Sequence, residues 1–243
     1  MSTTQIDSEL LANRPARRPL YTWGALAALL LVFAGFARTF YLNAMLAHFP
    51  LTGLLVFHGL VMTLWFVLFF VQVRLVASHR TAVHRRVGVY GAVLAALVLI
   101  VGTTTAIVAA KAGHSPPGAP PALVFLAIPL GDMVLFAGLV GSALWLRRRP
   151  EHHKRLMLVA TLGILPAAIS RIPIEAFQSA GLPAFFGVAD LLILGCIAAD
   201  TIRHRRLHPA FGWGFGFVVL TQVARFLLAG TAQWMAFAKW LTG

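Results

Sequence analysis

Long apolar runs separated by short polar segments dominate this amino-acid sequence. Seven runs reach the roughly 20 helical residues that are needed to cross about 30 Å of hydrocarbon. They lie near residues 21–42, 53–76, 87–110, 122–146, 155–172, 184–201 and 211–231. Lipid offers no partner to open backbone groups, and the runs do not show the alternating pattern of barrel strands, so each is predicted to be a helix. The pattern therefore predicts an all-α fold, a bundle of seven transmembrane helices.

The polar segments between the runs are too short to form a second domain. Residues 1–20 are polar and contain Pro15 and Pro19, so we expect a disordered tail there. Residues 21–243 are predicted to form a single transmembrane domain. The segment 113–121, which reads GHSPPGAPP, has the composition of an extended linker. The first run is longer than the apolar core of a signal peptide and is not followed by a cleavage site, so we expect it to be retained.

Composition indicates the same class of protein. Of the 243 residues, 59% are apolar and 11% are charged, whereas roughly 25% are charged in an ordinary soluble domain. The mean hydropathy is +0.83. A soluble domain could not hide so much apolar surface. The chain is therefore predicted to be an integral membrane protein, with the lipid bilayer as its main partner.

The basic residues predict how the bundle is oriented. The net charge is +13, and 15 of the 20 Lys and Arg residues lie in the tail or in the second, fourth and sixth loops between runs. By the positive-inside rule, the N-terminus is cytoplasmic and the C-terminus is outside. Because orientation explains these charges, we expect no nucleic-acid partner.

A short pattern of His, a basic residue, Arg and an apolar residue begins three of the runs. It occurs at 84–87, 153–156 and 204–207. One interpretation is interfacial anchoring, in which the basic side chains reach lipid phosphates. The other interpretation makes His84 and His153 ligands of a cofactor at the cytoplasmic rim. The third copy favours anchoring, because an anchor can be repeated without any special partner.

Several polar side chains fall inside the outer halves of the runs. These are Asp132, Asp190, Gln222 and Arg225, with Arg171 at the outer end of the fifth run. An isolated charge at mid-bilayer costs roughly 2.5–3.5 kcal/mol. We therefore expect one of the two aspartates to lie within salt-bridge reach of one of the two arginines. The group would either set helix register through ion pairs or line a polar cavity that binds a ligand or a proton.

His58 is the histidine that lies well inside a run. Met62, Trp65, Phe69 and Gln72 follow it on the same helical face. A half-polar ring facing lipid is unfavourable, so this stripe is predicted to be buried, with His58 pointing toward a cavity bounded by Asp132 and Asp190. The chain has no phosphate-binding loop, dinucleotide fingerprint, zinc-protease motif or nucleophile elbow. Its single cysteine, Cys196, excludes internal disulfides and cysteine-rich metal sites, and no metal-ion site or catalytic residue is assigned.

Two resemblances follow from these residues. His58, Met62 and Gln72, then VHRRVG at 83–88, HKRLM at 153–157 and Arg171 together resemble a group of uncharacterised bacterial multi-pass membrane proteins, known as domains of unknown function. The likeness covers most of the chain after residue 50. It implies a place in the bacterial inner membrane and brings no assigned activity.

The second resemblance is to transmembrane di-haem b-type cytochromes. In that family, histidines on the second and fourth helices hold one haem, and histidines on the third and fifth hold the other. His58 is similar to the second-helix ligand, and His84 and His153 are similar in order to the third- and fifth-helix pair. Asp132 stands roughly where the fourth-helix histidine is expected. The resemblance implies at most one haem b, with His58 as the first choice of ligand.

These observations lead to one expected function and two alternatives. We expect an inner-membrane protein with a polar cavity in the outer half of the bundle and a redox role linked to haem or a quinone. A small-molecule, ion or proton transporter would instead use Asp132, Asp190 and Arg225 as relay residues. A non-catalytic assembly factor of a membrane complex is the third hypothesis.

Overall fold

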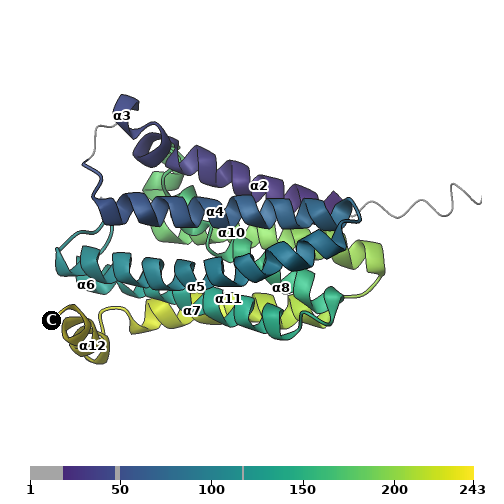
Figure 1. The fold of residues 1–243 in the computed structure, drawn as a ribbon. Helices are drawn as coiled ribbons and strands as arrows, with labels where there is room; N and C mark the ends of the chain where they lie inside the picture. Colours follow the sequence, from purple (N-terminus) through teal and green to yellow (C-terminus); the bar gives the residue numbers. More distant parts are fainter. Residues whose placement is uncertain (1–18, 47–49, 117) are drawn as a thin grey trace, which may run out of the picture.

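The computed structural model describes residues 19–46, 50–116 and 118–243, and all regular structure in these ranges is helical (Figure 1). The elements are α2 (Pro19–Phe36), the π-helix η1 (Ala37–Tyr41), α3 (Asn43–Leu46), α4 (Gly53–Ala77), α5 (Thr81–Lys111), α6 (Ala122–Phe125), α7 (Ala127–Trp145), α8 (Pro150–Gly163), α9 (Pro166–Ile169), α10 (Glu175–His204), α11 (Pro209–Leu228) and α12 (Ala232–Thr242). The all-α prediction is confirmed. The predicted tail lies outside the described residues except for its last two positions, where α2 has already begun.

Six helices in the described ranges are long and apolar enough to cross a membrane. They are Leu20–Tyr41, Gly53–Ala77, Thr81–Lys111, Ala122–Trp145, Gln178–His204 and Pro209–Leu228. Large apolar side chains on their outward faces are exposed, among them Leu64, Val89, Ile100, Leu191, Leu220 and Leu227. Exposing such an apolar surface to water costs free energy, whereas contact with lipid does not. The chain is therefore a multi-pass membrane protein.

The fifth predicted run differs from the other six, because it forms two short helices instead of one long helix. α8 ends at Gly163, and Pro166 stands in the first turn of α9. A proline has no backbone N–H and clashes with the preceding turn, so it cannot continue α8. Both short helices are buried: α8 packs against α2, α7, α10 and α11, and α9 packs against α2 and α10. This run is apolar because protein surrounds it.

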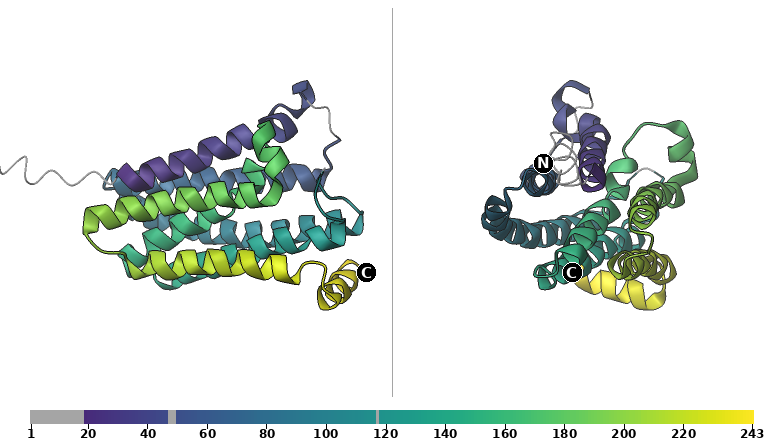
Figure 2. Two further views of the ribbon diagram at one scale, coloured as in Figure 1. Left: turned by 180° about the vertical axis from the view of Figure 1, so that it is seen from behind. Right: turned by 90° about the vertical axis from the view of Figure 1, so that its right-hand side faces the viewer.

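The chain runs back and forth along one bundle axis (Figure 2). α4 packs against α2 and α5, α5 also packs against α7, and α7 packs against α8 and α11. α2 approaches α9 so closely that a Cβ at Gly35 would meet the backbone carbonyl of Ala168. The buried α8 thus lies among helices from both halves of the sequence.

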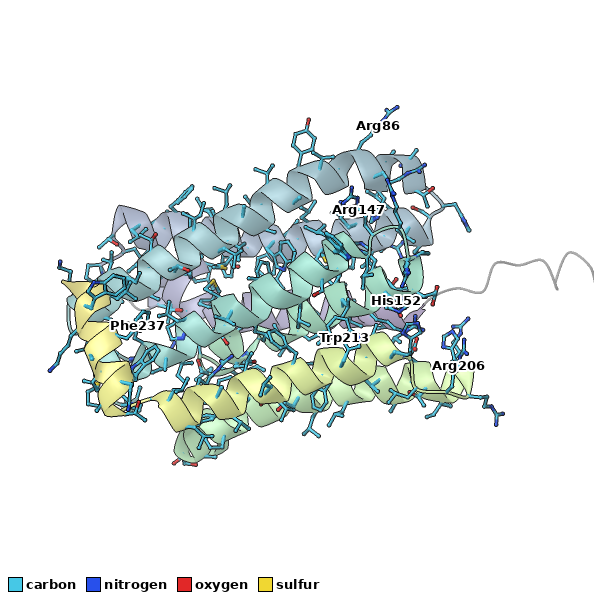
Figure 3. All side chains as sticks on the ribbon, turned by 90° about the horizontal axis from the view of Figure 1, so that it is seen from below. Arg86, Arg147, His152, Arg206, Trp213 and Phe237 are labelled. Atoms are coloured by element: carbon cyan, nitrogen blue, oxygen red, sulfur yellow. The ribbon has the colours of Figure 1, made fainter. Side chains whose placement is uncertain are left out.

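The two ends of the bundle differ in chemistry. Arg86, Arg147, His152 and Arg206 all lie at one end, while Phe237 of α12 lies at the other (Figure 3). We call the first the basic end and the second the opposite end. The segregation agrees with the predicted gathering of basic loops on one side of the membrane.

α12 turns away from α11 at the opposite end (Figure 1). The indole Nε1 of Trp234 donates to the carbonyl of Leu123 at 2.8 Å, and Ala238 is fully buried against Ala106 and Leu126. The short helix is thereby fixed to α5 and α6. An indole at the end of a bundle is typical of a membrane–water boundary.

Candidate functional site

A buried ion pair joins α7 to α11 in the half of the bundle toward the opposite end. Nη1 of Arg225 donates to Oδ1 of Asp132 at 2.6 Å, and the two residues are 3% and 7% exposed. Nε of Arg225 donates to the carbonyl of Thr221 at 3.1 Å. The prediction that one of the aspartates pairs with one of the arginines is confirmed. The pair is almost fully buried, so each partner is needed to stabilise the other.

Asp190 and Gln222 extend this group to α10. Nε2 of Gln222 donates to Oδ1 of Asp190 at 2.9 Å. The guanidinium of Arg225 also lies over the ring of Phe186 on α10, at 5.1 Å from its centroid. We call Asp132, Asp190, Gln222 and Arg225 the polar cluster. Side chains of three helices meet here, and a cavity beside them stays a prediction.

Arg171 was expected near the polar cluster, but its contacts are elsewhere. Its guanidinium lies over the ring of Phe36, at 4.6 Å from the centroid, and Nη1 donates to the carbonyl of Ala167. The reason is the break in the fifth run: α9 ends at Ile169, so Arg171 lies in the exposed turn before α10. No ion pair of Arg171 with an aspartate occurs among the described residues.

The orientation of His58 toward a cavity bounded by Asp132 and Asp190 stays a prediction. The ring of His58 faces α5, against the backbone of Val101, and its Nδ1 is buried without a hydrogen-bond partner among the described residues. α4 packs against α2 and α5, and its Trp65 also contacts Phe136 of α7, the helix that carries Asp132. The stripe itself is correct in part, since Trp65 and Phe69 are buried.

The structure does bring His84 and His153 together at the basic end. Their ring centroids are 6.4 Å apart and the ring planes are inclined by 74°. Nδ1 of His153 lies 2.8 Å from the carbonyl of Ala143. A carbonyl can only accept, so Nδ1 carries the hydrogen and Nε2 of a neutral His153 keeps its lone pair. The side-chain amide of Gln72 lies 2.7 Å from Nδ1 of His84.

An apolar groove lies between α5 and α7, near this histidine pair. Its volume is about 190 Å³, and its lining residues are Ala92, Ala95, Ala96, Leu99, Phe136, Ala137, Val140, Gly141 and Leu144. Leu144 is next in sequence to Ala143, whose carbonyl holds His153. The small alanine and glycine residues of this wall leave space that larger side chains would fill.

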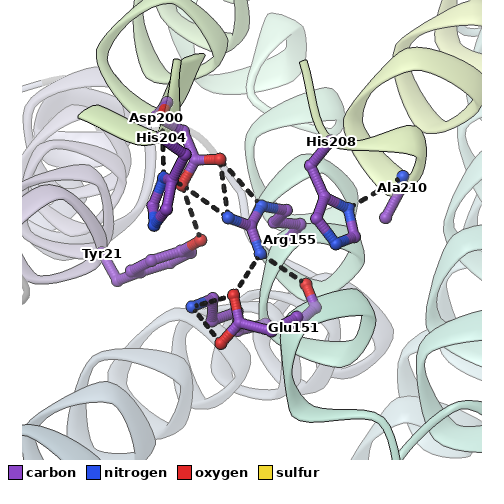
Figure 4. A network of polar contacts seen from close by, with 8 residues as sticks. Tyr21, Glu151, Arg155, Asp200, His204, His208 and Ala210 are labelled. Atoms are coloured by element: carbon purple, nitrogen blue, oxygen red, sulfur yellow. Dashed lines mark hydrogen bonds and ion pairs between the residues drawn. The ribbon is translucent and has the colours of Figure 1, made fainter. Parts of the chain in front are cut away.

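A second buried ion pair, which the sequence reasoning missed, lies at the basic end. Arg155 of α8 and Asp200 of α10 are each 1% exposed, and they form three N–H···O contacts of 2.7 to 2.9 Å (Figure 4). Tyr21 of α2 adds a longer contact to Asp200, with 3.4 Å between the hydroxyl and Oδ1. The network therefore ties α2, α8 and α10 together.

Two titratable groups on the exposed side of this network, Glu151 and His208, have shifted pKa values. Burial favours neutral Glu151, but hydrogen bonds from Lys154 and Arg155 outweigh it and lower the pKa of Glu151 to about 2. Burial, followed by the charge of Arg155 and the neighbouring His152, lowers the pKa of His208. The rings of His152 and His208 lie 4.7 Å apart.

The three copies of the repeated pattern therefore play different parts. His84 and His153 face each other, whereas Nδ1 of His204 donates to the carbonyl of Asp200 at 2.8 Å. Arg155, which the pattern assigned to the interface, is buried in an ion pair, while Arg206 is exposed. The available signal was Asp200 itself, one of only 7 acidic residues, placed at the same end of its run as the basic loops.

Comparison of the chain with protein-family models, with curated proteins and with solved structures gave no match. The geometry of the sites is therefore the basis for the proposals that follow.

Proposed function

We propose that the chain is a redox protein of the bacterial inner membrane that holds one haem b between His84 and His153. The observation that carries the proposal is the approach of these two rings from α5 and α8, at 6.4 Å between centroids. Two imidazoles that bind one metal from opposite sides, with metal–nitrogen bonds of about 2 Å, place their centroids roughly 6 Å apart. The pair is similar in order to the third- and fifth-helix histidines of the di-haem b-type cytochromes.

One of the two donor atoms is ready to bind a haem iron, and the other needs one hydrogen bond to change. His153 presents the lone pair of Nε2, because its Nδ1–H is held by the carbonyl of Ala143. The amide nitrogen of Gln72 donates to Nδ1 of His84 at 2.7 Å and to its carbonyl, and the amide oxygen accepts from the N–H of Gly88. A neutral His84 then carries its hydrogen on Nε2, so iron binding through Nε2 requires this amide to turn and accept from Nδ1–H. No three potential ligands of a bare metal ion converge in the described part of the chain, and an axial haem pair needs only two.

The surrounding side chains would also suit the carboxylates of a haem and its electron partner. Haem b supplies one-electron reduction and oxidation when it is bound. The exposed arginines at the basic end, including Arg85 and Arg86, would neutralise its carboxylates. The groove between α5 and α7 is lined by apolar side chains, which would suit a quinone as the electron partner.

The proposed function includes an orientation of the bundle in the membrane. With the basic end in the cytoplasm, the N-terminus is cytoplasmic and the C-terminus is outside. α8 and α9 together then make the fifth of seven crossings, although neither is long enough to cross alone.

The absorption spectrum of the purified protein tests the haem proposal. Protein expressed with added haem precursor should show a Soret band, and His84→Ala and His153→Ala should each lose most of it. His79→Asn is the matched control at the same end, because His79 is exposed and asparagine tolerates its positive φ of 60°. The control should keep the whole band.

His58→Ala distinguishes the ligands proposed from the structure, His84 and His153, from His58, the first choice of ligand from the sequence. Since His58 faces α5 without a second histidine, this variant should keep the Soret band. A band that survives in both His84→Ala and His153→Ala contradicts the proposed ligands. A wild-type protein that takes up no haem contradicts the redox function and favours the transporter or assembly-factor hypotheses.

A further inference from the structure

The polar cluster contains one more negative group than its partners can balance. Asp132 and Asp190 are two carboxyl groups, whereas Arg225 supplies a single positive charge and Gln222 is neutral. An arginine keeps its proton in proteins, so it cannot adjust to the imbalance. With both aspartates ionised the cluster would carry one uncompensated charge inside the bundle, where such a charge is expensive.

The contacts show which of the two carboxylates lacks compensation. Asp132 takes the direct ion pair at 2.6 Å, while Asp190 receives a hydrogen bond from the neutral amide of Gln222 at 2.9 Å. That bond uses Oδ1 and leaves Oδ2 of Asp190 without a hydrogen-bond partner among the described residues. Asp190 is also less buried than Asp132, which allows exchange with the outside.

A second observation points to the same spot. Arg225 is only 3% exposed, yet its Nη2 has no hydrogen-bond partner in the described structure. The same guanidinium lies over Phe186, one turn before Asp190 on α10, and acts electrostatically on Asp190. A buried donor without a partner is costly, and this guanidinium acts on Asp190, whose carboxyl group receives a hydrogen bond but no ion pair within the described part of the chain.

The neighbouring elements offer no other charge to balance Asp190. α2 and α9 contain no ionisable Asp, Glu, His, Lys or Arg residue. The charged residues of α8 lie in its first turns at the basic end, where Arg155 is paired with Asp200. On α10 itself, Asp200 is 10 residues away, roughly 15 Å along the helix, and Glu175 lies beyond the break in α10 at Gly181.

We propose that Asp190 is a proton-binding carboxyl group, which takes up one proton on Oδ2 and releases it again, while Asp132 stays ionised against Arg225. The proton forms an O–H bond on the carboxylate and needs no further ligand. A hard metal cation would need about six oxygen ligands, and the cluster offers the carboxyl group of Asp190 and one amide oxygen. The site lies in the opposite half of the bundle from the histidine pair, so the inference does not depend on haem binding.

Infrared difference spectroscopy tests this inference directly. The protein is reconstituted in lipid nanodiscs, and the carbonyl stretch of protonated carboxyl groups is followed as the pH is raised. The chain has only 7 acidic residues, so few bands compete. The wild type should lose one carboxyl band with rising pH, and Asp190→Asn should lack that band entirely. Glu175→Gln, which removes an exposed acid from the same helix, should keep it.

Asp132→Asn provides an independent arm if Asp190→Asn does not fold. Without Asp132, the guanidinium of Arg225 is free to compensate Asp190, so the titrating band should move to lower pH. A band that persists in Asp190→Asn, or that does not move in Asp132→Asn, overturns the assignment. A band that disappears when sodium replaces choline at constant pH also overturns it, because the site would then bind a metal cation.

Discussion

At the scale of residues, two arginines in the described part of the chain are buried with an aspartate partner on another helix. Arg155 contacts Asp200 through both ends of its guanidinium, and Arg225 contacts Asp132 through one nitrogen. Replacing a buried pair with apolar side chains is often neutral, whereas removing one partner leaves an uncompensated charge. The pairs therefore specify which helices meet more than they add stability.

This reasoning predicts the effect of breaking the pair at the basic end. Asp200→Asn should lower the free energy of unfolding by about 3–5 kcal/mol, because Arg155 would be left with Glu151 alone at the rim. The combined change Arg155→Met and Asp200→Leu should recover most of that loss. Chemical unfolding in detergent, followed by circular dichroism, measures both.

Glu151→Gln serves as the control for that prediction. The side chain of Glu151 is 46% exposed, so its ion pairs should contribute less than about 1 kcal/mol. Its pKa is lowered from 4.5 to about 2, so its contribution is present above pH 4.5 and disappears only as the pH falls through about 2. Its effect should therefore be constant between pH 5 and pH 8. An equal loss in Asp200→Asn and Glu151→Gln would contradict the importance of the buried pair.

At the scale of elements, the two short helices α8 and α9, which are separated by a break before Pro166, lie at the centre of the bundle. Leu156, Leu158, Val159 and Leu162 on α8 are fully or almost fully buried, and Leu165 and Ile169 continue that burial through the break. The break at Pro166 lets α9 lie against α2, where Gly35 faces the carbonyl of Ala168. The position of this element depends on a backbone contact that tolerates no side chain.

Gly35→Ala should therefore destabilise the protein although alanine favours helices. A Cβ at this position meets backbone, which cannot rotate away, so we expect a loss of about 1–3 kcal/mol. Gly195→Ala on α10 is the matched control, because open space surrounds that position. The control should raise stability by up to about 1 kcal/mol. Thermal unfolding in the same detergent compares the two, and equal transitions would show that α2 and α9 are not in close contact.

At the scale of the whole molecule, charge is separated along the bundle axis. The basic side chains gather at one end, and α12 with its aromatic residues covers part of the other (Figure 3). Lys and Arg near the ends of spans are kept on the cytoplasmic side during insertion. The proposed haem ligands lie at the basic end, and the proposed proton site lies in the other half of the protein.

Reporter fusions test this orientation and the number of crossings. Alkaline phosphatase should be active when fused after Gly243 and inactive when inserted at Ser78, which lies between α4 and α5 at the basic end. An insertion after Pro173, in the exposed turn before α10, should be active if α8 and α9 together complete a crossing. Activity at Ser78, or its absence at Pro173, would contradict the proposed topology.

The sequence by itself determined the class of the protein, six of its long helices and the gathering of basic residues at one end. These properties follow from run length and charge, which need no knowledge of neighbours. The cost of a lone charge also predicted that Asp132 or Asp190 would pair with an arginine. Only the tertiary structure decided that Arg225 is that arginine and that His84 meets His153. It also decided that Arg155 is buried against Asp200, since hydropathy cannot distinguish a run surrounded by lipid from one surrounded by protein.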